Sequence, residues 1–279
     1  MKSFLKKSKF VVHFYESLKF LYGAFNWRYN SNIVDRNCPF DGPLGALGFY
    51  GYSLNSSELV SLKTKAVGSI ENPLRLYSTD FTWLSDFFDK LKPIIMSYLG
   101  ETAKLDGINW FVTNPGEDNI SSNWHTDNVG TRLKVFVCVE GDGTIPTILM
   151  PSTERIPSTL SWIRNVMIEL LRWSGVSSKF RVGKSKSCEH KDGTVYIFDT
   201  QLLHRGGYEI GFNKRVIFHL EFSVPEKHKL LKGPIGTSEH NRFYFHKDLL
   251  KIDSLNSLID LDRANMSDDQ GEFFYYYSN

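Results

Sequence analysis

The chain has 279 residues, long enough for one large domain or two small ones, and its 41% hydrophobic and 14% aromatic residues can bury a sizeable core. Its 33 basic and 31 acidic residues give a net charge of +2, which is too balanced to hold nucleic acid by bulk attraction. The three cysteines are widely spaced and form neither a zinc-binding pattern nor a disulfide framework, so we expect a cytoplasmic protein.

The N-terminal segment is basic over residues 1–10 and rather apolar over 11–25. Glu16 and Lys19 interrupt the apolar run, which is too short and too charged to span a membrane, and no small-residue cleavage site follows it. We expect an amphipathic helix that packs onto the domain through Phe10, Phe14, Leu18 and Leu21. Peripheral contact with an anionic membrane surface is the alternative interpretation of this basic helix.

One strong helical pattern precedes the middle of the chain. Residues 36–57 are rich in Gly, Pro and Asn and are predicted to form a loop. Asp80 can cap a helix over 81–99, in which Pro93 is expected to cause a kink. Its apolar positions fall at helical spacing and are expected to cover a sheet; they are Trp83, Leu84, Phe87, Phe88, Leu91, Ile95 and Tyr98.

Short strands dominate the region from residue 105 to residue 223. We predict strands over 105–112, 133–139, 145–150, 194–198 and 215–223. A helix is predicted over 158–173, with the apolar set Leu160, Ile163, Met167, Leu170 and Leu171. After Pro225 the sequence is polar and irregular, with short helices expected near 245–262. Several short strands with few helices between them favour an antiparallel β-barrel or jelly roll.

The strand predicted over 215–223 has two different faces, because side chains alternate along a strand. One face carries Arg215, Ile217, His219 and Glu221, and the other carries only apolar side chains. If Arg215 points into the barrel, the apolar face points outward and needs a cover. The helix predicted over 81–99 is the obvious candidate.

Four residues carry the strongest functional signal: His125, Asp127, His204 and Arg215. His125 and Asp127 are two positions apart in an extended segment, so their side chains can share one metal ion. His204 follows an apolar strand at its polar end, where its side chain can reach a barrel mouth. Two histidines and one carboxylate on one face of a metal leave open positions, as in non-haem Fe(II) oxygenases. Arg215 can then pair with a carboxylate through a bidentate fork.

These motifs resemble the Fe(II)/2-oxoglutarate-dependent dioxygenases, and in detail their phytanoyl-CoA dioxygenase-like branch. The resemblance rests on Trp124-His-Thr-Asp127, the apolar strand after it, the segment Asp192-Gly-Thr-Val-Tyr-Ile-Phe-Asp199 that leads toward the second histidine, and His204 with Arg215. It covers about residues 105–225. It implies a mainly β fold with covering helices (α+β) around a double-stranded β-helix (jelly-roll or cupin-like) core. We expect one oxygenase domain over 1–279, with N-terminal and C-terminal extensions at 1–104 and 226–279.

The resemblance also implies the chemistry. His125, Asp127 and His204 would bind Fe(II), and 2-oxoglutarate and O2 would be co-substrates, with Arg215 holding the 5-carboxylate. An unactivated C–H bond would be hydroxylated, with release of succinate and CO2. Related halogenases have Gly or Ala at the position of Asp127, so the carboxylate here favours hydroxylation or a related oxidation.

Further contacts to the oxo-acid are expected from Asn109 and Trp110, on the strand before the metal motif, and from Thr147 on a later strand. Ordinary barrel packing is the alternative role for all three. Many members of the family have a Ser two residues after the arginine, where it helps to hold the oxo-acid. This chain has Ile217 there, so the second contact must come from elsewhere.

Basic residues near the motifs suggest a small-molecule substrate with an anionic group. Arg132 and Lys134 share one face of their strand and either line the mouth or face solvent. Lys184 and Lys186 belong to a basic run over 179–191, which is either a solvated loop or a clamp for a phosphate, nucleotide, coenzyme A or carboxylate group. The aromatic residues around this run are too few for a single-stranded nucleic-acid platform. We expect residues 151–192 to cover the mouth and determine substrate choice.

Two other functions remain open at this point. The chain could be a non-enzymatic, cupin-like metal-binding module for sensing or scaffolding, or an oxygenase that acts on protein or nucleic acid. His219 and Glu221 could be a second metal pair, but a buried, paired His–Glu is the simpler interpretation because no third ligand is evident. The remaining histidines, including His190, are scattered and are expected to be structural or exposed.

Overall fold

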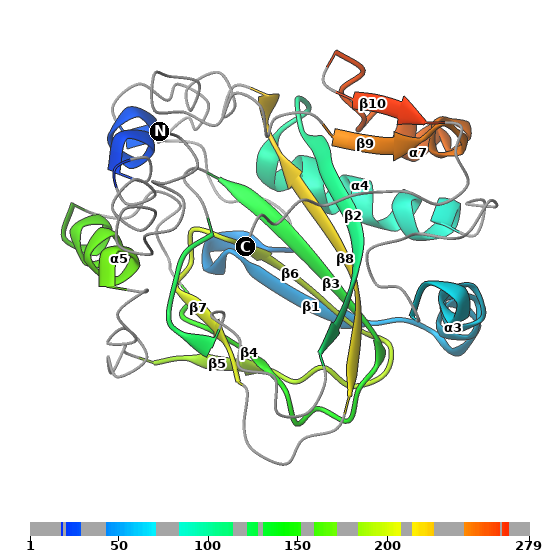
Figure 1. Ribbon diagram of the computed structural model, residues 1–279, viewed down its shortest axis with the longest axis horizontal. Coiled ribbons are helices and arrows are strands. Elements are labelled where there is room, and N and C mark those ends of the chain that lie inside the picture. Colours follow the sequence, from blue (N-terminus) through cyan, green and yellow to red (C-terminus); the bar gives the residue numbers. More distant parts are fainter. Residues whose placement is uncertain are drawn as a thin grey trace, which may run out of the picture.

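The computed structural model describes residues 18, 21–28, 43–70, 84–113, 122–127, 131–151, 159–171, 184–207, 214–225, 243–262 and 264–267 (Figure 1). Within those ranges, the side chains of a few residues, among them Asn109 and Trp110, are not described. In the described part of the chain no helix is long and apolar enough to cross a membrane.

The main sheet has five strands that run antiparallel in the order β1-β6-β3-β8-β2. They are β1 (Phe49–Ser53), β6 (Thr194–Asp199), β3 (Arg132–Glu140), β8 (Arg215–Ser223) and β2 (Lys104–Thr113). All but β1 match predicted strands. β1 and the 3-10 helix η1 (Gly45–Leu47) both lie within residues 36–57, for which a loop was predicted. The loop prediction is wrong for these two elements.

A second antiparallel sheet has the strand order β5-β4-β7, with β5 (Lys186–Cys188), β4 (Thr147–Leu149) and β7 (His204–Gly206). From β3 to β8 the chain passes from the main sheet to β4 and β5, back to β6, then to β7, and back to β8. The two sheets pack together through Phe49 and Phe198 on one side and Leu149 and Cys188 on the other.

The hydrophobic core lies between the outer face of the main sheet and two helices, α3 (Ser56–Ile70) and α4 (Ser85–Leu99). The predicted apolar positions of α4 from Leu84 to Tyr98 are buried in that core, while Asp80 and Trp83 lie outside the described residues. Val216, Phe218, Leu220 and Phe222 of β8 are buried in the same core. The prediction that a helix covers the apolar face of this strand is therefore confirmed. Helix α3 was not predicted.

Helix α5 (Thr159–Leu171) occurs where a helix was predicted, but its apolar set is arranged differently. Leu160, Ile163 and Met167 are exposed, whereas Val166 and Ile168 are buried. Ile168 contacts Trp124 and Leu203, which neighbour two of the predicted metal ligands. The buried face of this helix therefore lies against the predicted metal site.

Figure 1 shows α5 beside the N-terminal helix over 21–28. Arg28 donates a hydrogen bond to Thr159, and Phe25 meets the ring of Trp162 edge-on at 5.1 Å. Of the stripe predicted for this helix, Leu18 is exposed and Leu21 is half-buried, and Phe10 and Phe14 lie outside the described residues.

The described C-terminal residues contain η6 (Lys247–Lys251) and α7 (Asp253–Asn256), within the range expected for short helices. They also contain two parallel strands that were not predicted, β9 (Phe243–His246) and β10 (Ala264–Ser267). Leu249, Ile252, Leu255, Leu258 and Ile259 extend the main core.

Candidate metal centre

His125 and His204 come from distant parts of the sequence and meet at an isolated antiparallel bridge. The Nδ1 atom of His125 lies 2.6 Å from the carbonyl oxygen of Asn123, and Nδ1 of His204 lies 2.9 Å from that of Leu202. A carbonyl oxygen only accepts, so each Nδ1 carries the proton and donates it. Each Nε2, which faces Asp127, is therefore the ring nitrogen left to bind a metal.

Asp127 completes a compact group with the two imidazoles. Its Oδ1 atom lies 3.4 Å from Nε2 of His125, and its Oδ2 atom lies 3.2 Å from Nε2 of His204. One ligand atom from each residue can be chosen so that all lie within 4.8 Å of one another. Among the described residues, no other group of His, Cys, Asp or Glu meets this criterion. The donor set fits a first-row divalent ion that binds imidazole and carboxylate on one face.

Cations surround the carboxylate of Asp127. Lys134 forms an ion pair with its Oδ2 atom, and Nη2 of Arg132 lies 3.8 Å from the same oxygen. Burial alone would raise the pKa of Asp127, but the charge of Lys134 and the contacts with His204 and His125 hold it well below its usual range. The carboxylate is therefore ionised and ready to bind a metal.

A second buried carboxylate, Glu221, pairs with the same two cations, Arg132 and Lys134. It is 1% exposed and accepts a hydrogen bond from Arg132 at 2.8 Å, and Lys134 lies 3.7 Å from its other oxygen. His219 lies 3.4 Å from Glu221, and burial lowers the pKa of His219 to about 3. The predicted buried His–Glu pair is confirmed. Glu221 also belongs to a network of four charged residues, with Arg132, Lys134 and the proposed ligand Asp127.

Arg215 is buried at the start of β8. It donates hydrogen bonds to the carbonyl oxygen of Ile145 at 3.0 Å and to the hydroxyl of Thr113 at 3.3 Å. These bonds fix the plane of the guanidinium, which has five N–H donors in total. A planar, fixed fork of this kind is suited to a carboxylate.

Aromatic side chains line the interior from His204 toward Arg215. The ring of Phe198 lies 5.3 Å from the ring of His204, and Phe136 meets Phe198 at 5.2 Å. The ring of His190 lies 5.8 Å from Phe136. These contacts form a continuous row of rings from His204 to His190.

Thr147, predicted to contact the oxo-acid, is buried, and its hydroxyl lies 2.8 Å from Nε2 of His190. His190 was expected to be structural or exposed; it is 1% exposed and stands in this interior. The strand register places Asn109 opposite His219 and Trp110 opposite Phe218. Lys184 and Lys186 are exposed, and Lys186 lies 4.9 Å over the ring of Phe49.

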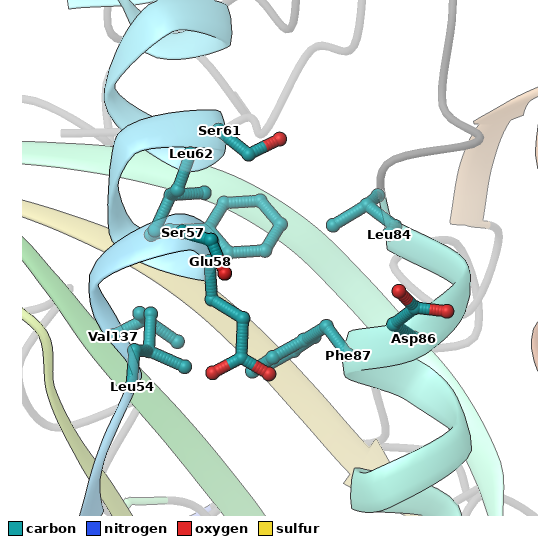
Figure 2. A pocket seen from close by; sticks show the side chains of 10 residues that line it. Leu54, Ser57, Glu58, Ser61, Leu62, Leu84, Asp86, Phe87 and Val137 are labelled. Carbon is teal, nitrogen blue, oxygen red and sulfur yellow. The ribbon is translucent and has the colours of Figure 1, made fainter.

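A separate cavity of about 270 Å³ lies on the outer face of the main sheet, between α3 and α4 (Figure 2). Its lining is mainly apolar, and Figure 2 shows the Glu58 side chain reaching from α3 toward Phe87 of α4. Lys90 forms an ion pair with Glu58. Val137 and Phe218 line the cavity from the core side of the sheet, so it is not continuous with the interior that holds Asp127. None of the predicted site residues lines it.

Comparison with known proteins bears on the fold. No family model and no curated protein matches the chain. The crystal structure of EctD from S. alaskensis with bound Fe aligns with it at a TM-score of 0.51 and 14% identity, over 75% of this chain and 86% of that one. The chain has the fold of EctD. At 14% identity, this likeness shows the fold alone.

Two more distant structures are also similar. The epimerase SnoN, in complex with Fe3+, alpha ketoglutarate and nogalamycin RO, aligns at a TM-score of 0.45 and 12% identity, over 71% of this chain and 86% of that one. EvdMO1 aligns at a TM-score of 0.45 and 17% identity, over 66% of this chain. The alignment spans half of the length of EvdMO1.

Proposed function

We propose that the chain is an Fe(II)- and 2-oxoglutarate-dependent oxygenase of the phytanoyl-CoA dioxygenase-like branch. It would hydroxylate an unactivated C–H bond of a small or carrier-linked metabolite, and part of that substrate would be anionic. The observation that carries the proposal is the meeting of His125, Asp127 and His204, with both Nδ1 atoms tied to backbone carbonyls. The balanced reaction converts the substrate, 2-oxoglutarate and O2 into the hydroxylated product, succinate and CO2.

The path of the chain supports a double-stranded β-helix (jelly-roll or cupin-like) core for this enzyme. Successive strands from β3 to β8 pass between the two sheets, and His125 extends the order of the second sheet through its bridge to β7. Such a core places residues from several strands around one interior. The proposed domain is the whole chain, 1–279, with its core at about 105–225.

Each group in the interior has a role in the proposal. His125, Asp127 and His204 would hold Fe(II), which when bound supplies open positions for an oxo-acid and for O2. Arg215 would hold the far carboxylate of 2-oxoglutarate, because its guanidinium is already fixed by Ile145 and Thr113. Phe136 and Phe198 would exclude water from the space between the proposed metal ligands and Arg215.

Asp127 also bears on the type of reaction. Its carboxylate occupies the position that related halogenases leave to Gly or Ala, which supports hydroxylation. Lys134 holds one of its oxygens and so orients the carboxylate toward the two imidazoles. Lys134 and Arg132 are buried beside the proposed metal rather than exposed to solvent.

Turnover without the primary substrate tests the proposal, because many such oxygenases slowly decarboxylate 2-oxoglutarate alone. Purified protein would be loaded with Fe(II) and 2-oxoglutarate without oxygen and then exposed to O2, and succinate would be measured. We expect succinate from the parent and none above background from His204→Ala or Arg215→Ala. Metal binding without 2-oxoglutarate binding or succinate would indicate the non-enzymatic metal-binding module instead.

A further inference from the structure

His190 and Thr147 form a buried polar pair that the sequence did not indicate. His190 follows β5, Thr147 begins β4, and their side chains are 1% and 5% exposed respectively. Nε2 of His190 lies 2.8 Å from the hydroxyl oxygen of Thr147. The other ring nitrogen, Nδ1, is buried and has no hydrogen-bond partner. A buried polar atom without a partner costs free energy, so it calls for an explanation.

Counting hydrogens shows that this pair always has one donor to spare. Burial, and then the charge of Arg215, lower the pKa of His190 well below its usual range, so the imidazole is neutral and carries one N–H. Thr147 carries one O–H. Only one of these two hydrogens lies in the bond between them. Either Nδ1–H of His190 or the hydroxyl hydrogen of Thr147 is left to donate elsewhere.

The pair lies at the Arg215 end of the interior. Thr147 is two residues after Ile145, whose carbonyl oxygen accepts a hydrogen bond from Arg215. Thr147 also shares a strand face with Leu149, which packs between the two sheets. The ring of His190 meets Phe136, part of the row of rings that leads to His204. The spare donor therefore belongs to the same interior as the buried guanidinium.

The chain has a reason to need a donor at this place. The residue two positions after Arg215 on the same strand face is Ile217, whose side chain cannot donate a hydrogen bond. A carboxylate has two oxygens and about four lone-pair sites, more than one guanidinium fork satisfies. A neutral donor beside Arg215 would meet that demand without adding charge.

We infer that the Thr147–His190 pair donates a hydrogen bond to the far carboxylate of a 2-oxo diacid held by Arg215. This inference rests on the proposed function and identifies His190 as a binding residue of its site. The direction of the bond between Thr147 and His190 decides which of the two donates, but in either case loss of one disturbs the other. The two residues therefore act as a unit.

The test compares two ligands on Mn2+-loaded protein without oxygen, so that no turnover occurs. Calorimetric titration would measure binding of 2-oxoglutarate and of 2-oxopentanoate, which has the same chain length and lacks the far carboxylate. The variants are His190→Phe, which keeps an aromatic ring, and Thr147→Val, which keeps the volume. Thr64→Val is the matched control, because the exposed hydroxyl of Thr64 donates to the carbonyl oxygen of Val60 within α3, on the outer face of the main sheet.

We expect each variant to bind 2-oxoglutarate about tenfold to a hundredfold more weakly, the range for a hydrogen bond to a charged group. Binding of 2-oxopentanoate should be unchanged, and the control should match the parent for both ligands. The double variant should lose little more than either single variant, because the pair acts together.

Three results would overturn the inference, and they differ from failure of the proposed function. Unchanged 2-oxoglutarate affinity in both variants would mean that the pair does not touch the ligand. Equal weakening of both ligands would mean that it only supports the packing. Strictly additive losses would mean that the two residues are not a unit. If the metal-loaded parent itself binds no 2-oxoglutarate, the proposed function fails and the inference fails with it.

Discussion

The backbones of His125 and His204 hydrogen-bond to each other in both directions, each at an N···O distance of 2.9 Å. This bridge brings their rings to a centroid distance of 4.3 Å. The main chain holds the two positions together, and the imidazole side chains are not needed for it. The main chain therefore sets the spacing of these two proposed metal ligands.

A first prediction follows for His125→Ala and His204→Ala. Both variants should fold, because the backbone bridge remains, yet each should lose most of its bound divalent metal. Elemental analysis of protein loaded with Mn2+ would measure the metal, and circular dichroism would check the fold. Glu189→Ala, on an exposed residue, should bind metal as the parent does. Unchanged metal content in both histidine variants would contradict the assignment.

The parts of the fold that sequence could predict are those with a strong periodic signal. Phe218 and Leu220 alternate with His219 and Glu221 along β8, and the two faces meet a core and an interior respectively. The helical spacing of Phe87 and its neighbours likewise predicted the cover of the sheet. In both cases, the spacing of the apolar residues predicts which face of the strand or helix is buried.

Other features depend on partners that lie far away in the sequence. β1 was missed because the Gly, Pro and Asn content of residues 36–57 suggested a loop. In the structure, a Cβ at Gly51 would lie 2.8 Å from the ring of Tyr196 on the neighbouring strand, so this glycine allows the close approach. The apolar set of α5 did not reveal that Ile168 would be the side chain packed on Trp124. The pairing of Glu221 with Arg132 and of His190 with Thr147 joins residues that are 89 and 43 positions apart, and no local pattern indicates it.

Arg215→Lys tests the fork rather than the charge. Lysine keeps the positive charge but presents one ammonium group in place of a planar fork, so 2-oxoglutarate should bind about tenfold or more weakly. Calorimetry on Mn2+-loaded protein would measure this. Lys214→Ala is the matched control, since Lys214 is a neighbouring cation with 38% of its side chain exposed. Arg215→Ala binding as tightly as the parent would mean that another cation holds the acid.

Lys134→Met should destabilise the metal-free protein by about 3 kcal/mol, because Asp127 and Glu221 lose a buried counter-charge. The loss should be smaller with saturating Mn2+, because the metal then compensates the charge of Asp127. Urea unfolding with chelator and with Mn2+ would give the loss of stability in the absence and in the presence of metal.

Glu221→Gln should behave in the opposite way, with a larger loss of stability in Mn2+, because the metal adds positive charge beside Arg132 and Lys134. Equal losses with and without metal would show that the charge network and the metal site are independent.

His219 makes stability depend on pH. Its folded pKa of about 3 is below the ordinary value of 6.5, so between these values the unfolded chain binds the proton and the folded chain does not. Stability from this residue is therefore present above pH 6.5 and is lost as pH falls toward 3, at up to about 1.4 kcal/mol per pH unit. His219→Phe should show a correspondingly shallower loss in urea unfolding from pH 7 to pH 4. A slope equal to that of the parent would mean that His219 is protonated in the folded protein.

The last prediction concerns the cover proposed over residues 151–192. Its described part places Ile168 of α5 against Trp124, next to the metal motif, and leaves Lys184 and Lys186 exposed. Each exposed charge contributes little to binding. The double variant Lys184→Gln/Lys186→Gln should therefore weaken the binding of an anionic substrate only about twofold to tenfold. Binding of metal and of 2-oxoglutarate should not change, because both lysine side chains are exposed and neither contacts a proposed metal ligand or Arg215 in the described residues.

Candidate anionic substrates for this test would be those that accelerate succinate release by the parent. The measurement is the concentration that gives half-maximal acceleration, at low and at high salt, since salt screens exposed charges. Lys191→Gln is the control: Lys191 is exposed, lies close in sequence, and pairs with Glu189 at 2.8 Å. Equally weakened binding of substrate, metal and 2-oxoglutarate would mean that residues 151–192 have a structural role. No weakening of any of them would mean that the two lysines are only solvated.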